Sequence, residues 1–118
     1  RIAMRLDNVG KIIAERLLDL DASGGQAQVR VLIGEPQRIP DSSDCFCPYR
    51  VVGLADDTVR YTEGVDGAQA IYLAMEAVGS LLAATPEGRA GKLTWYGERA
   101  LGFPVREQRP HLRLVASS

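Results

Sequence analysis

The chain contains few of the residues that enzymes most often use for catalysis. Its 118 residues include a single histidine, His111, and two cysteines. A Ser-His-Asp or Cys-His arrangement needs an imidazole beside the nucleophile, and His111 lies near the end of the sequence in a segment that we expect to be a mobile tail. The sequence therefore predicts no catalytic residue, and we favour a protein that is not an enzyme.

The two cysteines do not indicate a metal site. Cys45 and Cys47 are separated by one residue, and the only histidine is far away in the sequence, whereas structural zinc normally takes four Cys or His ligands. A disulfide framework usually accompanies a secretion signal, which we do not find. We interpret the pair as reduced thiols near the start of a strand, with a redox role as the weaker alternative, and we predict no metal and no cofactor.

Long hydrophobic runs are also missing. No stretch approaches the roughly 20 apolar residues that span a bilayer, and residues 1–7 alternate charged and apolar side chains, unlike the core of a signal peptide. The turn at residues 23–25 lacks the helix and the lysine of a phosphate-binding loop. We expect a cytoplasmic protein without membrane association.

Charge is unevenly distributed along the chain. Residues 41–87 hold eight acidic and two basic residues, whereas residues 88–118 hold six basic and two acidic ones. A nucleic-acid interface needs a basic face with stacking aromatics or a groove-reading helix, and the one long predicted helix has no Lys or Arg. We do not expect nucleic-acid binding, and we interpret the basic end as a solvated tail.

The clearest local signal is a helix over residues 66–83. Asp66 and Gln69 have the spacing of a capping box, in which each side chain accepts a backbone N–H bond. Leu73 falls among polar residues, so a second surface could touch the helix there, and Gly79 has either a close backbone neighbour or no special role. At helical spacing, the apolar stripe consists of Ile71, Val78 and Leu82, flanked by Ala74, Met75 and Leu81.

Most other segments have the alternation of strands. Residues 11–21 and 26–33 predict a first hairpin, although a helix is an alternative for residues 11–21. A loop follows over residues 34–44. Residues 47–54 and 58–63 predict a second hairpin, and residues 92–96 a short late strand.

This order predicts an α+β domain: an antiparallel sheet of about four to five strands, with one long helix packed on one face. We expect one domain over residues 11–105. Residues 1–10 would form a loosely ordered extension, and residues 106–118 a mobile basic tail.

Candidate binding residues lie mainly on the second hairpin. Tyr and Arg are frequent anchors of interfaces, and alternation places some of the hairpin Tyr and Arg on a common face. We predict that they are exposed, whereas Trp95 and Phe103 belong to the core. The predicted binding residues are Tyr49, Arg50, Arg60, Tyr61 and the out-of-place Leu73.

Several short motifs follow one another over residues 12–105. They are Val31-Leu32-Ile33-Gly34-Glu35-Pro36, Cys47-Pro48-Tyr49-Arg50, Gly53-Leu54, Gly64-Val65-Asp66, Gln69-Ala70, Leu73-Ala74-Met75-Glu76, Lys92-Leu93-Thr94-Trp95 and Leu101-Gly102-Phe103-Pro104. Together they resemble an uncharacterised family of small, stand-alone bacterial proteins. The resemblance implies a bacterial source and one compact domain, and it implies no activity.

Two functions fit the sequence. We favour a non-enzymatic protein that acts by protein–protein interaction, as a homodimer or by neutralising a partner. The alternative is a domain or modest enzyme that binds a small anionic ligand with the hairpin Tyr and Arg residues, since an arginine can hydrogen-bond a carboxylate or phosphate.

Overall fold

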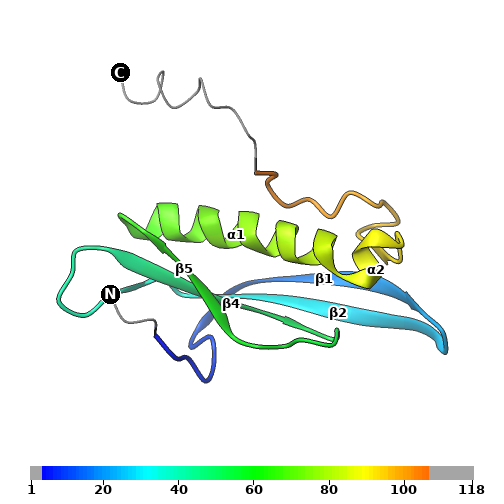
Figure 1. Cartoon of the computed structure of the whole chain (residues 1–118), viewed down its shortest axis with the longest axis horizontal. Helices are drawn as coiled ribbons and strands as arrows, with labels where there is room; N and C mark the ends of the chain where they lie inside the picture. Colours follow the sequence, from blue (N-terminus) through cyan, green and yellow to red (C-terminus); the bar gives the residue numbers. More distant parts are fainter. Residues whose placement is uncertain (1–3, 107–118) are drawn as a thin grey trace, which may run out of the picture.

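The computed structural model describes residues 4–106. Within these residues, six strands and two helices follow one another (Figure 1). Their bounds are β1 Ile12–Ala22, β2 Gly25–Gly34, β3 Gln37–Arg38, β4 Cys45–Val52, β5 Arg60–Gly64, α1 Gly67–Ala84, α2 Pro86–Arg89 and β6 Leu93–Thr94.

The strands form one antiparallel sheet with α1 across one face, which confirms the predicted α+β fold (Figure 1). The hydrogen-bonded path is β3–β4–β2–β1–β6, and β5 pairs with β4. Two elements were not predicted. β3 lies inside the expected loop. α2 forms between α1 and β6, because Thr85 caps it and Pro86 occupies its first turn.

The N-terminus of α1 is capped by side chains, as predicted. The Asp66 carboxylate accepts a hydrogen bond from the Gln69 N–H at 2.8 Å, and Gln69 Oε1 accepts one from the Val65 N–H at 2.7 Å. The second bond reaches one residue further back than in a regular capping box. These bonds satisfy donors that the first turn of a helix leaves unpaired.

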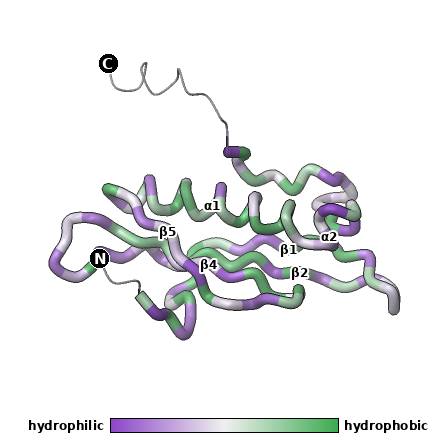
Figure 2. The backbone as a smooth tube through the Cα atoms, viewed as in Figure 1, coloured by the Kyte–Doolittle hydropathy of each residue, from purple (hydrophilic) through white to green (hydrophobic). Residues whose placement is uncertain are grey.

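The core lies between α1 and the facing side of β1, β2 and β4. Alternate residues of each strand point toward α1, and Figure 2 shows that hydrophobic residues predominate in α1 and in the strands beneath it. The helix contributes Ala70, Ala74, Val78 and Leu82, each fully buried. By length and composition α1 is also apolar enough to cross a bilayer, but its buried stripe packs on the sheet, as in core helices of globular proteins.

Two glycines allow close approach to α1. A Cβ at Gly64 would lie 2.5 Å from the Ala70 backbone nitrogen, so β5 can touch the helix only without a side chain there. A Cβ at Gly79 would lie 3.0 Å from Phe103 Cβ and 3.3 Å from the Pro104 oxygen. Of the two alternatives for Gly79, the close neighbour is therefore correct. This neighbour is the segment after β6, which runs along α1 (Figure 1).

Among residues 4–106, the segment before β1 covers one end of the other face of the sheet (Figure 1). Residues 4–10, which we expected to be loosely ordered, lie on that side (Figure 1). Val9 is 6% exposed, and the Met4 N–H donates to the Tyr61 hydroxyl at 2.9 Å. Residues 1–3 and the predicted tail from residue 107 onward lie outside the described residues.

Leu82→Ala tests the core. Leu82 is fully buried, so we expect the substitution to lower the free energy of unfolding by about 2–5 kcal/mol. Leu17→Ala is the matched control, because Leu17 is 46% exposed and its loss should cost less than about 1 kcal/mol. Urea denaturation followed by circular dichroism measures both, and equal losses would contradict the assigned core.

Candidate functional site

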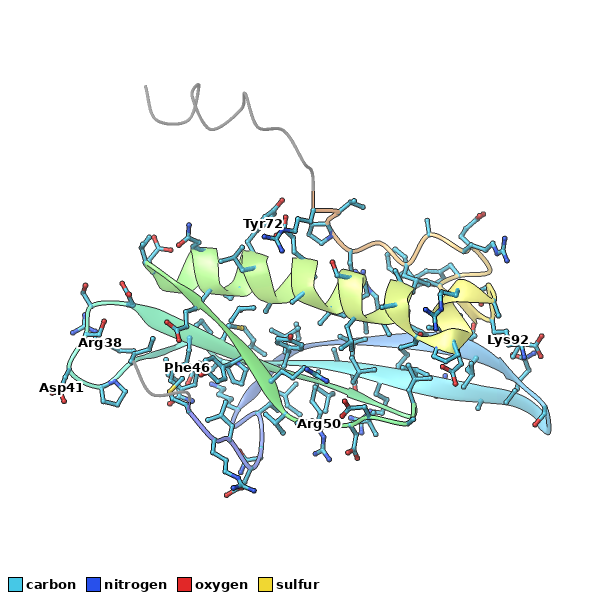
Figure 3. The ribbon with its side chains drawn as sticks, viewed as in Figure 1. Arg38, Asp41, Phe46, Arg50, Tyr72 and Lys92 are labelled. Carbon is cyan, nitrogen blue, oxygen red and sulfur yellow. The ribbon has the colours of Figure 1, made fainter. Side chains whose placement is uncertain are left out.

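The four predicted hairpin residues do not converge on one surface. Tyr49 lies opposite Arg60 in the β4–β5 ladder, so both are on the α1 side, and Arg50 and Tyr61 are on the other side. Figure 3 shows Arg50 on the side of the sheet away from α1. The prediction that Tyr49 is exposed was wrong: it is 6% exposed and belongs to the core, because β4 is an interior strand whose α1 side is covered.

Both hairpin arginines already bind aspartates of the adjoining turn. Arg50 Nη2 lies 3.2 Å from Asp57 Oδ2, and Arg50 Nε donates to the Asp57 carbonyl at 2.7 Å. Arg60 Nη2 lies 2.7 Å from Asp56 Oδ2. Hydrogen bonds from Thr58 first, and then the charge of Arg60, hold the pKa of Asp56 below its usual value. These contacts fix the conformation of the turn, and they leave each guanidinium less available to bind an external anion.

The hairpin tyrosines also have internal contacts. Burial raises the pKa of Tyr49, and the charge of Arg60 opposes this rise in part. The ring of Tyr61 packs edge-on against Phe46 with centroids 6.0 Å apart. The acidic pair at residues 56–57 was the sequence signal that could have predicted the internal pairing of the arginines.

Leu73, the fifth predicted residue, is half-buried beside a shallow hollow. This hollow, of about 610 Å³, lies between α1 and β5 and is also bordered by Thr62, Glu76 and Arg106. Tyr72, one residue earlier, is 53% exposed and points away from the sheet (Figure 3). Leu73 thus borders a depression beside β5, and Tyr72 is exposed on the side of α1 away from the sheet; that Leu73 contacts a second surface stays a prediction.

Three exposed aliphatic residues on β1 were not identified from the sequence. Ile12, Ile13 and Leu17 are 46%, 44% and 46% exposed, and we call these three residues the β1 patch. β6 pairs with β1 only at Asp19 and Leu20, so in the described part of the chain no strand lies beside the earlier residues of β1 on that edge. Alternation in residues 11–21 was visible in the sequence, but which side of the strand would stay uncovered was not.

A second hollow lies between α1 and the segment of residues 99–106. It measures about 330 Å³, and we call it the α1 hollow. Gly79 and Ala83 line it from the helix, and Arg99 and Arg106 stand beside it. Sequence reasoning had assigned the basic residues of this region to a solvated tail, and Arg99 and Arg106 instead border a concave apolar surface.

Metal binding finds no support in residues 4–106. No three His, Cys, Asp or Glu side chains of this part of the chain are grouped as metal ligands. Cys45 and Cys47 are free thiols, and the Cys47 thiol donates a hydrogen bond to the Gly34 carbonyl with a sulfur–oxygen distance of 3.4 Å. Burial raises the pKa of Cys47 to about 11, so its reactive thiolate is scarce at neutral pH.

A family model with the description "Domain of unknown function (DUF6968)" matches residues 14–105. The chain belongs to this family. The match to DUF6968 confirms the resemblance to an uncharacterised family and begins within β1. No curated protein and no solved structure matches the chain. The description of this family names no activity.

The two thiols of this DUF6968 protein should differ in reactivity. We expect Ellman's reagent at neutral pH to modify Cys45, which is half-buried, well before Cys47, which is fully buried. In a Cys45→Ser variant, the remaining rate should rise as the pH approaches about 11, because Cys47 then ionises. Two thiols reacting at equal rates in the folded protein would contradict this prediction.

Proposed function

We propose that this DUF6968 protein is not an enzyme and acts by binding another protein molecule through the β1 patch. The observation that carries the proposal is the exposure of Ile12, Ile13 and Leu17 on one strand at an open part of the sheet edge. Single apolar residues scattered on a surface are ordinary, whereas several exposed apolar residues near one another beside polar ones are typical of interaction sites. Here the three lie within six residues of one strand, with Glu15 between Ile13 and Leu17.

The surroundings of the β1 patch favour contact through side chains over extended strand addition. The register of β1 against β2 shifts between Ile12 and Ala14, and such a bulge interrupts regular pairing with an added strand. Glu15 and Arg30 form an ion pair at 2.6 Å on the uncovered face. A partner with an apolar surface and a polar rim would fit this arrangement, whether it is a second copy or a protein that is neutralised.

The alternative function, an anionic ligand held by the hairpin Tyr and Arg residues, has less geometric support. Arg50 and Arg60 are paired with Asp57 and Asp56, and they lie on opposite faces of the sheet. A ligand there would have to displace an aspartate and could reach only one of the two arginines. Protein binding through the β1 patch therefore has the stronger geometric support.

We also propose a cytoplasmic location. The two cysteines are free although only one residue lies between them, and reduced thiols are usual in the cytosol. A bacterial source stays a prediction that rests on the resemblance of motifs.

Leu17→Lys tests the proposal. A lysine within an apolar contact has to be desolvated, so we expect at least about tenfold weaker binding. Binding is measured by sedimentation equilibrium for self-association, and by capture of a stoichiometric partner from lysate of the source cell. Val65→Lys is the matched control, because Val65 is 68% exposed and follows β5, which is separated from β1 by β4 and β2 in the sheet.

Two results would overturn the proposal. One is a wild-type chain that stays monomeric up to about 500 µM and captures no partner. The other is an association that Leu17→Lys and Val65→Lys weaken equally.

A further inference from the structure

We infer that the α1 hollow binds a small molecule with an apolar body and an anionic head, a carboxylate or a phosphate. The inference concerns a surface other than the β1 patch and does not depend on the proposed function. It rests on the shape of the hollow, its apolar lining and the two arginines beside it.

The hollow has the size and lining of a small-molecule site. Its volume of about 330 Å³ falls within the range of roughly 300–1,000 Å³ that is usual for ligand pockets. Phe103 packs directly against Gly79, where even a Cβ would lie only 3.0 Å from the Phe103 Cβ, and Ala83, Leu101 and Val105 add to the apolar lining of the hollow. An alkyl chain or an aromatic ring that lies over this lining, and not between Gly79 and Phe103, would lose contact with water.

Arg99 is held beside the hollow by packing and not by an ion pair. Its guanidinium lies against Gly91, where a Cβ would overlap it, and Gly91 has a φ of +71°. Among residues 4–106, no carboxylate lies within ion-pair distance of Arg99 or Arg106. By contrast, Arg30, Arg50 and Arg60 each have an acidic partner.

Charge complementarity therefore selects the head group. Two guanidinium groups beside one apolar hollow favour an anion, and a guanidinium binds carboxylate or phosphate through paired N–H donors. None of the hollow's lining residues is acidic, so a cationic head would find no partner there. A neutral head would leave both arginines without a counter-charge.

Calorimetric titration of the full chain with ten-carbon probes tests the inference. We expect decanoate or decyl phosphate to bind, and the tighter of the two identifies the head group. Decanol and decyltrimethylammonium should bind at least about tenfold more weakly. Amide chemical shifts should change most at Gly79, Ser80 and Ala83, which line the hollow on α1.

Single substitutions separate the site from general charge effects. Arg99→Gln and Arg106→Gln should each weaken decanoate binding about tenfold. Arg38→Gln is the matched control, because Arg38 is exposed, forms no ion pair within residues 4–106 and lies on β3 far from the hollow (Figure 3). Leu17→Lys should leave decanoate binding unchanged.

Three results would overturn the inference. They are no binding of either anionic probe at millimolar concentration, equal binding of decanol and decanoate, or equal weakening by Arg38→Gln and Arg99→Gln. Shift changes confined to residues away from α1 would also place the probe elsewhere and reject this site.

Discussion

The contact of Arg16 with two aromatic rings ties the last described segment to the rest of the domain. The guanidinium carbon of Arg16 lies 3.9 Å from the centre of a Trp95 ring and 4.7 Å from that of Phe103. Its Nη1 also donates to the Leu101 carbonyl at 3.0 Å. Cation–π contacts of this kind contribute about 0.5–2 kcal/mol each. One side chain of β1 thereby anchors the segment that forms one side of the α1 hollow.

The turn after β6 decides where that segment goes. Trp95 and Glu98 exchange two backbone hydrogen bonds at 2.8 and 3.0 Å, and Tyr96 and Gly97 between them have φ of 51° and 80°. Two successive positive φ values are typical of a type I′ turn, which reverses the chain within two residues. The chain therefore leaves the edge of β1 and passes over to α1, so the β1 patch stays uncovered and the α1 hollow is formed.

Local signals in the sequence were sufficient for much of the fold. The Asp66 cap and the apolar spacing of α1 depend on residues three or four positions apart. The cap was predicted, as was the burial of Val78 and Leu82, whereas Ala70 takes the fully buried place expected for Ile71, which is only partly buried. Alternation predicted the strands, but it does not reveal which face a helix will cover, and Tyr49 was therefore misjudged. β3 is two residues long and α2 is four, too short for periodicity to detect.

The two surfaces that carry the proposals depend on contacts between distant parts of the sequence. Arg16 and Leu101 are 85 positions apart, and nothing near Arg16 in the sequence indicates that it will meet Trp95 or Phe103. The pairing of Arg50 and Arg60 with the nearby aspartates could have been predicted from the sequence, because the two arginines flank a turn that contains both aspartates. The exposure of the β1 patch could not be predicted in this way, because it depends on which face of β1 the distant helix α1 covers.

The most direct test of this account is a proton NOE spectrum of the full chain and of its Arg16→Ala variant. The wild type should show strong cross-peaks between the α protons of Gly79 and the β protons of Phe103, and between the side chain of Arg16 and the ring of Trp95. In the variant, the Gly79–Phe103 cross-peaks should weaken while those within the buried core remain. A wild-type spectrum without these cross-peaks, or a variant that retains Gly79–Phe103 contact at full strength, would contradict the claim that Arg16 holds this segment on α1.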